Sequence, residues 1–341
     1  MKILLTGATG MLGAYILYHL LKQGNEVRAI KRSTADLTTV EAVFAFLNQK
    51  EANPILLNNN LLEWMEGDLQ DFCTLLDGIQ GVEAIYHNAA LVSYNPKDED
   101  RIFEVNLNAT ATLVDLAIEH QVPYFHHVSS VAALDRQKGK TTNEDAANFI
   151  RNFSSAYAKS KYLAELEVWR GYAEGLSGVI INPGVILGIG RYQSGSGKLF
   201  SSVNDGMPFY PKGANAYVDA EDVAKTFLKL ADDPQYHHNR YVCVAEHHPH
   251  RKVLTLIAET LGKKPPGIQA PLYGAYALAA WQRLKHSLFG SDVVITPELA
   301  RSSSKVHTYH NQKLKKAIAY DFKPIAQSIA EIGQHFRKLH S

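Results

Sequence analysis

Cysteine is nearly absent from this chain, which has only Cys73 and Cys243 among its 341 residues. Two cysteines cannot build a disulfide framework, and these two show no spacing typical of a metal site. A reducing compartment fits this composition. An excess of charge is also lacking, because the formal net charge is +1 at pH 7. The charge balance therefore gives no reason to expect nucleic acid or an anionic membrane as a partner.

Long apolar runs are missing as well. No segment reaches the about 18 apolar residues that a membrane span needs, and the nearest one, 271–289, contains Arg283, Lys285 and His286. The first residues run straight into a glycine loop, so they are too short for the apolar region of a signal peptide. We therefore expect a cytoplasmic protein without an integral membrane segment. The composition suits one large α/β domain and a smaller second one.

Metal binding is not expected either, although the chain has 15 histidines. Several histidines are adjacent, as in His126-His127 and His247-His248, and adjacent residues on a strand point to opposite faces. None shows the i, i+4 spacing of a helical zinc site.

What the sequence does contain is a glycine motif between a predicted strand and a predicted helix. Ile3-Leu4-Leu5 is typical of a short buried strand, and Thr6-Gly7-Ala8-Thr9-Gly10-Met11-Leu12-Gly13 follows it. The next residues have the apolar spacing of a helix that ends at Gly24. In this context the glycines indicate a turn whose backbone N–H groups approach a pyrophosphate at a helix N-terminus. The alternative is a purely structural glycine turn.

The end of the second predicted strand, 26–30, is basic. Lys31 and Arg32 follow it, Arg28 lies within it, and no acid occurs before Asp36. An acid at this point would bind the ribose 2′-hydroxyl of NAD. An arginine can instead pair with a 2′-phosphate, so Arg32 favours NADP(H) over NAD(H). The alternative is a solvated basic strand end.

Tyr157 and Lys161 are four residues apart, so they share one face of a predicted helix. An ammonium that close favours the phenolate, and we expect it to lower the pKa of Tyr157 toward neutral pH. Such a phenol can exchange a proton with a carbonyl or an alcohol. A surface pair on an amphipathic helix is the alternative. Ser129 and Ser130 add support, since they follow the predicted strand 124–128 at the sheet edge where ligands bind.

Predicted strands and helices alternate over residues 1–180, which indicates a doubly wound parallel sheet of the α/β class. A long helix is expected over 98–120 and a further strand over 179–188. The Gly/Ser stretch 194–198 predicts a flexible linker or a loop on the substrate side. The helix predicted at 271–289 could cover an apolar substrate, touch a membrane surface, or pack within the second domain.

The ordered motifs resemble the extended short-chain dehydrogenase/reductase superfamily, also called the NAD-dependent epimerase/dehydratase family. The motifs that carry this resemblance stand in the family's order: Thr6-Gly7-x-x-Gly10-x-x-Gly13, Gly67-Asp68-Leu69, His87-Asn88-Ala89-Ala90, Val128-Ser129-Ser130, Tyr157-x-x-x-Lys161, Asn182-Pro183-Gly184-Val185 and Tyr217-Val218-Asp219-x-x-Asp222-Val223-Ala224. They are most similar to the dihydroflavonol-reductase and hydroxysteroid-dehydrogenase branch. Asn182 departs from that branch, which usually has an arginine there.

The resemblance implies a Rossmann-type domain over 1–185 and about 215–245, with a smaller, mostly helical substrate-binding part over 186–214 and 246–341. It implies a catalytic set of Ser130, Tyr157 and Lys161, with Ser129 as the alternative serine. It also implies that the cofactor is bound by Gly7, Thr9, Gly10, Met11, Leu12, Gly13, Arg32, Asp68, Leu69, Ala89, Ala90, Ser129, Tyr157, Lys161, Pro183, Gly184 and Val185. For Asp68, helix capping is the alternative.

Three functions follow from these features. The first is an NADP(H)-dependent reductase of a ketone or aldehyde, or a dehydrogenase of a secondary alcohol, acting on an apolar small molecule. The second is a nucleotide-sugar epimerase with bound NAD, and the third is a cofactor-sensing protein without turnover. The complete Ser-Tyr-Lys set argues against the third. Relatives often dimerise through the helices that correspond to 98–120 and 156–173, so a homodimer is a further expectation by analogy.

Overall fold

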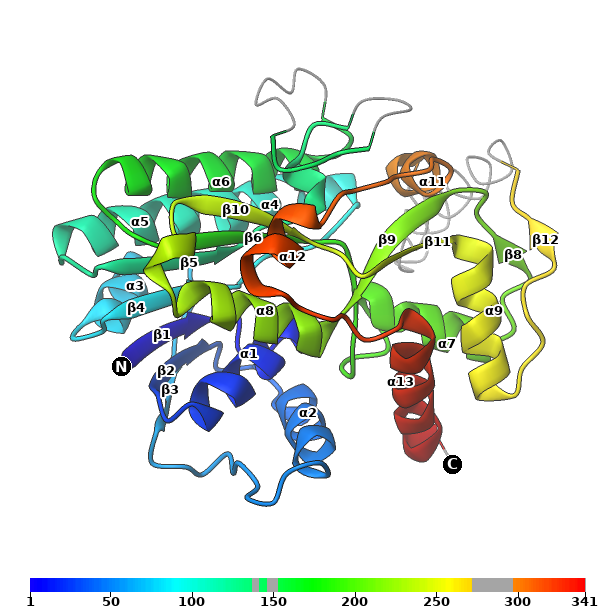
Figure 1. The fold of residues 1–341 in the computed structure, drawn as a ribbon, viewed down its shortest axis with the longest axis horizontal. Coiled ribbons are helices and arrows are strands. Elements are labelled where there is room, and N and C mark those ends of the chain that lie inside the picture. The colour runs from blue at the N-terminus through cyan, green and yellow to red at the C-terminus, as the bar shows by residue number, and fades with distance from the viewer. Residues whose placement is uncertain (137–140, 146–152, 272–296, 341) are drawn as a thin grey trace.

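The computed structural model describes residues 1–136, 141–145, 153–271 and 297–340, and its centre is one parallel sheet (Figure 1). Every pairing between neighbouring strands of this sheet is parallel. The strand order confirms the predicted doubly wound Rossmann-type fold. In spatial order the strands are β10 (Asn239–Cys243), β6 (Val179–Pro183), β5 (Tyr124–Val128), β4 (Ala84–His87), β1 (Lys2–Thr6), β2 (Glu26–Lys31) and β3 (Leu62–Glu66).

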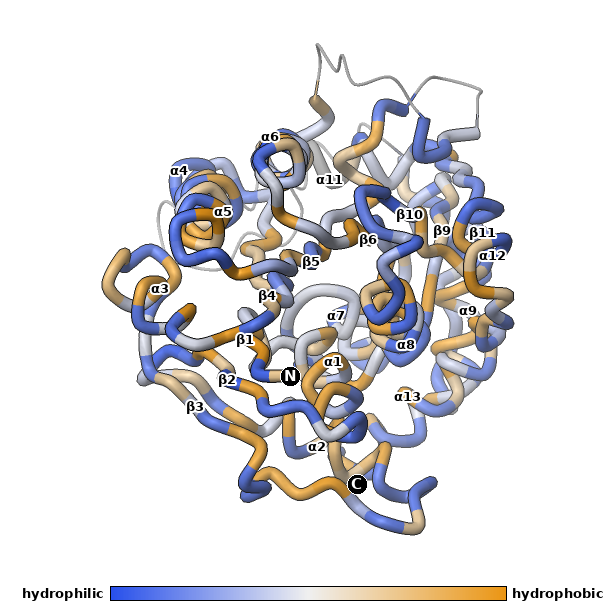
Figure 2. Tube along the Cα trace, turned by 60° about the vertical axis from the view of Figure 1, so that its left-hand side comes forward, coloured by the Kyte–Doolittle hydropathy of each residue, from blue (hydrophilic) through white to orange (hydrophobic). Residues whose placement is uncertain are grey.

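Helices cover both faces of the sheet. On one face lie α1 (Met11–Lys22), α2 (Thr38–Asn48) and α8 (Ala220–Ala231), and on the other lie α3 (Phe72–Ile79), α5 (Ala109–Glu119) and α6 (Ala156–Ala173) (Figure 1). Consecutive strand residues serve opposite faces. Ile3 and Leu5 of β1 therefore belong to the apolar cluster with α1 and α8, whereas Leu4 belongs to the cluster with α5 and α6. Figure 2 shows hydrophobic and hydrophilic residues alternating along these helices.

The helix expected over 98–120 is interrupted. It consists of a short 3₁₀ turn (Pro96–Asp98), α4 (Glu99–Phe103), a π-helical turn (Glu104–Asn108) and α5. The amide of Asn106, inside the π turn, accepts from the Leu91 N–H at 2.7 Å and donates to the Leu91 carbonyl at 3.0 Å. These bonds tie the turn to the loop after β4.

The strand expected over 179–188 is also divided, because the chain changes sheets at Gly184. A side chain there would not fit, since its Cβ would lie 2.7 Å from the Ala216 carbonyl oxygen. Beyond it, β7 (Val185–Leu187) pairs with β9 (Ala214–Asp219), which pairs with β11 (Glu246–Pro249) in a second sheet. Of the predicted Rossmann segment 215–245, β9 therefore lies in the small sheet and β10 in the large one. The predicted division into two domains stays a prediction.

Most of the remaining elements lie on the side of the small sheet (Figure 1). The stretch 194–198 forms a 3₁₀ turn (Gly195–Gly197) that leads into α7. The helix predicted at 271–289 falls almost wholly outside the described residues. Among the residues that are described, no helix combines the length and apolar character needed to cross a membrane. The elements of this side are α7 (Lys198–Asn204), β8 (Phe209–Tyr210), α9 (His250–Leu261), β12 (Ile268–Gln269), α11 (Pro297–Ser303) and α13 (Ile325–His340), whereas α12 (Gln312–Ile318) contacts β10 of the large sheet and α8.

Candidate active site

The glycine loop connects β1 to α1 in a conformation that only glycine fits. Gly7 has φ +72°, and a Cβ on it would lie 2.8 Å from the Ala89 backbone. A Cβ on Gly13 would lie 1.9 Å from the Gly7 carbonyl oxygen. The N-cap of α1 is Gly10, and the first turn has neither a side-chain cap nor an acid. The backbone N–H groups at this positive helix end are therefore left for an anion, which fits the pyrophosphate of a dinucleotide.

The loop after β4 is joined to the glycine loop. The Asn88 amide donates to the Gly7 carbonyl at 3.2 Å, and the Ala89 N–H donates to Thr6 Oγ1 at 3.2 Å. Ala89 is buried and Ala90 is exposed. The structure thus brings the predicted pyrophosphate and ribose residues together at the carboxyl edge of the sheet, where open α/β sheets bind ligands.

The three basic residues at the end of β2 differ in their contacts. Arg28 pairs with Glu63 at 3.1 Å and Lys31 with Glu66 at 3.0 Å, so both bind the neighbouring strand β3. Arg32 is exposed, and no hydrogen bond or ion pair within the described chain engages its guanidinium. Of the three basic residues that the sequence groups together, Arg32 is the one available for a ligand.

Asp68 does not cap α3. Its carboxylate accepts from the Gln70 N–H at 3.0 Å in a local turn, and Asp71 is the N-cap that accepts from the Thr74 N–H at 3.0 Å. Asp68 is exposed at the end of β3, so its role toward adenine, with Leu69, stays a prediction.

Ser129 and Ser130 point in opposite directions, as consecutive residues of extended backbone do. Ser129 is buried and donates to Glu165 Oε2 at 2.7 Å. A side-chain hydrogen bond joins Ser130 to Tyr157, and Ser130 Oγ accepts from the Ala132 N–H at 3.1 Å. The register that the sequence leaves open therefore puts Ser130, not Ser129, beside the tyrosine.

Lys161 lies one turn beyond Tyr157 on α6 and is almost completely buried. Its Nζ donates to the Val128 carbonyl at 2.7 Å and lies 3.5 Å from His127 Nε2. Burial lowers the pKa of Lys161 to about 8, against the opposing effect of nearby Glu165. A cation held here faces the carboxyl end of β5, within the site and not at the helix surface.

The expected lowering of the Tyr157 pKa toward neutral pH is wrong. Burial raises the pKa of Tyr157 to about 12, and the hydrogen bond from Ser130 and the charge of Arg136 oppose this rise only partly. Lys161 contributes no resolved effect, because its ammonium is directed at the Val128 carbonyl. Tyr157 therefore holds its proton at neutral pH.

Two further contacts hold the tyrosine's turn of α6. Ser160 Oγ donates to the Tyr157 carbonyl at 2.9 Å, and the buried Asn106 amide donates to Ser160 Oγ at 3.0 Å. The π turn thereby fixes α6 as well as the loop after β4. Sequence reasoning missed this role of Asn106, because a π turn leaves no separate spacing in the pattern of apolar residues.

A buried ion pair lies behind the serines. Arg240 Nη1 of β10 donates to Glu165 Oε1 at 2.8 Å. Asn182 donates both to Glu165 Oε2 at 2.9 Å and to the Ser130 carbonyl at 3.1 Å. Asn182 stands where the resembling branch has an arginine, and here the neighbouring strand supplies the guanidinium.

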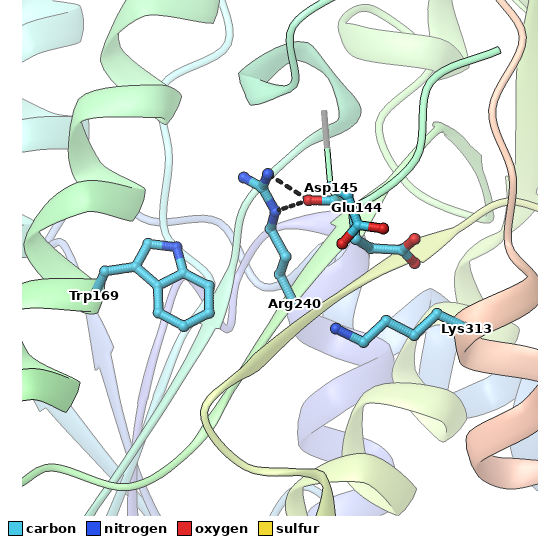
Figure 3. Close-up of a pocket in the computed structure, with 5 residues that line it drawn as sticks. All are labelled: Glu144, Asp145, Trp169, Arg240 and Lys313. Carbon is cyan, nitrogen blue, oxygen red and sulfur yellow. Dashed lines mark hydrogen bonds between the residues drawn. The ribbon is translucent and has the colours of Figure 1, made fainter. Parts of the chain in front are cut away.

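Arg240 also borders a cavity of about 340 Å³ together with Glu144, Asp145, Trp169 and Lys313 (Figure 3). The dashed lines in Figure 3 join the Arg240 guanidinium to the Glu144 carbonyl, at 2.8 Å for Nε. Trp169 lies twelve residues beyond Tyr157 on α6, about 18 Å at the helical rise. Trp169 and the cavity are therefore distant from Tyr157, and the contacts around Tyr157 define the candidate active site.

The family described as Male sterility protein, an NAD-binding family, matches residues 5–210, more than half of the chain. The chain belongs to this family. It is a member of the extended short-chain dehydrogenase/reductase superfamily, as the motifs indicate, and an NAD(P)-dependent enzyme of that type. The last of the predicted cofactor-binding residues, Pro183, Gly184 and Val185, lie where β6 passes into β7.

Curated relatives align with most of the chain. Sterol demethylase protein B of Methylococcus capsulatus is 29% identical over 80% of this chain and 78% of its own. A putative dihydroflavonol 4-reductase of Synechocystis is 25% identical over 97% of this chain and 93% of its own. Cinnamoyl-CoA reductase 1 of Petunia hybrida is 25% identical over 96% and 90%.

Solved structures share the fold over the whole chain. The protein gox2253 has a TM-score of 0.78 at 24% identity, covering 99% of this chain and 98% of its own. Yeast methylglyoxal/isovaleraldehyde reductase Gre2, complexed with NADPH, has 0.76 at 18%, covering 100% and 99%. The UDP-glucose 4-epimerase of Thermus thermophilus, complexed with NAD, has 0.73 at 21%, covering 99% of each. At these identities the likeness is one of fold.

Proposed function

We propose that the chain is an NADPH-dependent reductase of a ketone or aldehyde. The observation that carries this proposal is the hydrogen bond between Ser130 and Tyr157, with buried Lys161 one turn further along α6. These groups lie at the carboxyl edge of the same sheet that holds the glycine loop. A carbonyl substrate between the cofactor and this pair would meet two hydroxyl groups at its oxygen.

Each residue has a distinct role in this proposal. Bound NADPH supplies the hydride. The Ser130 hydroxyl and the Tyr157 phenol hold the carbonyl oxygen, and Tyr157 gives its proton to that oxygen as negative charge develops there. A Tyr157 pKa of about 12 keeps the phenol protonated at neutral pH, which is the state that a proton donor needs. Lys161 provides a buried positive charge and would bind the nicotinamide ribose.

The cofactor site is proposed along the carboxyl edge of the sheet. The glycine loop, with Thr9, Met11 and Leu12, would bind the pyrophosphate, and Arg32 would pair with the 2′-phosphate. The exposed, unengaged guanidinium of Arg32 supports NADPH over NADH. The remaining contacts follow the resemblance: adenine at Asp68 and Leu69, its ribose at Ala89 and Ala90, and the nicotinamide amide at Pro183, Gly184 and Val185. The domain division predicted from the sequence would separate this site from the substrate part.

The curated relatives support reduction. Two of those described above are reductases by name, and they align with more than nine-tenths of this chain. The epimerase alternative rests on fold likeness alone.

The experiment that tests the proposal is oxidation of NADPH by the purified protein with a panel of ketones and aldehydes. Tyr157→Phe removes the proton donor and keeps the ring, so we expect a loss of kcat of about 100-fold or more. Tyr162→Phe is the matched control on the same helix and should stay near wild type. Turnover that survives in Tyr157→Phe would contradict the assignment. Absence of turnover in the wild type, with a UDP-sugar raising its Tm, would favour the epimerase instead.

A further inference from the structure

A segment near the C-terminus, residues 305–310, brings polar side chains into the region around Tyr157. Residues 305–310 run between β9 and the short described stretch 141–145. The Thr142 N–H donates to the Thr308 carbonyl at 2.9 Å, and the His307 N–H donates to the Ala214 carbonyl at 3.0 Å. This pairing fixes the backbone on both sides of Tyr309.

Arg136 reaches the same place from the end of β5. It follows the 3₁₀ turn Val131–Ala133 that begins at Ser130, and its guanidinium carbon lies 5.9 Å from the centre of the Tyr309 ring. On the other side, the ring centres of Tyr94 and Tyr157 are 6.2 Å apart. Arg136 is thus close to the catalytic serine along the chain, and its contact with the Tyr309 ring brings Tyr309 to the same region.

Each member of this group has a buried polar atom that nothing satisfies. Arg136 Nε, His307 Nε2 and the Tyr309 hydroxyl have no hydrogen-bond partner among the described residues. Tyr309 is only 3% exposed. Leaving such a group buried without a partner is destabilising, and native proteins rarely leave three close together. A ligand that accepts hydrogen bonds would satisfy the two donors, Arg136 Nε and the Tyr309 hydroxyl.

The charge of the group is positive and unbalanced. The charge of Arg136 opposes the rise in the pKa values of buried Tyr157 and Tyr309 and helps to lower the pKa of His307, and no carboxylate contributes to any of the three. Burial, with Arg136 and Lys305, lowers the pKa of His307 to about 4, so its imidazole is neutral at pH 7. The cation at the centre is therefore Arg136.

We propose that Arg136, His307 and Tyr309 form a subsite beside Tyr157 for an anionic group of the substrate, a carboxylate or a phosphate. The guanidinium would pair with the anion, and the Tyr309 hydroxyl would donate to it, with the neutral His307 imidazole beside them. This inference rests on the proposed reductase function and gives its otherwise apolar carbonyl substrate a negative charge on the side of residues 305–310.

Matched aldehydes test the subsite in the NADPH assay. The three substrates are 4-carboxybenzaldehyde, its neutral methyl ester, and 4-formylphenyl phosphate, and the readout is kcat/KM for each. We expect kcat/KM for both anionic aldehydes, or for the one that the subsite accepts, to exceed kcat/KM for the neutral ester by about tenfold or more. The reason is that a hydrogen bond to a charged group contributes about 1.5–3 kcal/mol. The carboxylate and phosphate arms then distinguish the two sources. Arg136→Gln should remove the preference, and Tyr309→Phe should reduce it.

A binding measurement without turnover keeps this test separate from the proposed function. Calorimetric titration of the protein with saturating NADPH compares 4-(hydroxymethyl)benzoate with its methyl ester, because neither alcohol can accept a hydride. Arg337→Gln, on the exposed face of α13, is the control and should bind as wild type does. Equal affinity for both compounds, or an anion preference that persists in Arg136→Gln, would overturn the subsite. Anion binding without hydride transfer to any carbonyl would instead overturn the reductase and leave the subsite standing.

Discussion

Replacing Arg240 by methionine should destabilise the protein far more than the same replacement of Arg170. Arg170 has more ion pairs, but it lies at the surface. Arg240 is 9% exposed by its side chain and its partner Glu165 2%, at 2.8 Å. The variant leaves Glu165 buried, with hydrogen bonds from Ser129, Asn182 and Trp169 but no guanidinium. An uncompensated buried charge costs about 3–5 kcal/mol, so we expect the free energy of unfolding to fall by that amount.

Arg170 provides the matched control, on the same helix as Glu165. It pairs with Asp115, Glu167 and Glu174 at 2.6–3.1 Å, but its side chain is 35% exposed. Exposed pairs contribute about 0–1 kcal/mol, so Arg170→Met should cost little. The double variant Arg240→Met/Glu165→Met should recover most of the loss, because it removes the stranded charge as well.

Urea unfolding of the four proteins, followed by circular dichroism, measures these differences. A loss below about 1 kcal/mol in Arg240→Met, or a double variant no more stable than the single one, would refute the reasoning. The catalytic consequence is measured beside it: the loosened Asn182 should reduce kcat by releasing the Ser130 backbone.

Two further predictions concern charges. Arg32→Ala should weaken binding of NADPH by about tenfold or more and leave NADH unaffected, because only NADPH has the 2′-phosphate; calorimetric titration with both cofactors checks this, and an unchanged NADPH affinity would remove Arg32 from the site. Lys161→Met should change how stability depends on pH. Burial puts the Lys161 pKa at about 8 instead of 10.5, so between these values the unfolded chain binds more protons and wild-type stability rises with pH relative to the variant. The rise is at most about 3 kcal/mol, at about 1.36 kcal/mol per pH unit, and parallel stability curves for the two proteins would contradict it.

The elements that hold the site are readable from the sequence, because their patterns are local. The apolar run 124–128 and the helix that starts at Ala156 are found where predicted. The glycine turn after β1 is also predictable, since Gly7 and Gly13 allow close backbone contacts that a side chain would block. Which serine faces Tyr157 is not readable, because a slip of one residue exchanges the two faces of a strand.

What the sequence could not reveal depends on distant partners. Asn106 acts through Leu91 and Ser160, and the charge that accompanies Asn182 comes from Arg240 on a neighbouring strand. The Tyr157 pKa was mispredicted because a spacing of four residues gives the reach of the Lys161 ammonium but not its direction. Burial and the Val128 carbonyl decide that direction.

The most direct test of the central claim compares Ser130→Ala with Ser129→Ala in NADPH-dependent carbonyl reduction. Ser130 bonds to Tyr157, whereas Ser129 bonds to Glu165. The account predicts that Ser130→Ala lowers kcat by about 100-fold or more, as loss of a donor to a developing oxyanion does, with the Kd for NADPH unchanged. It predicts that Ser129→Ala lowers stability by about 1–3 kcal/mol and retains most of kcat. The reverse pattern, with Ser129→Ala inactive and Ser130→Ala active, would contradict it.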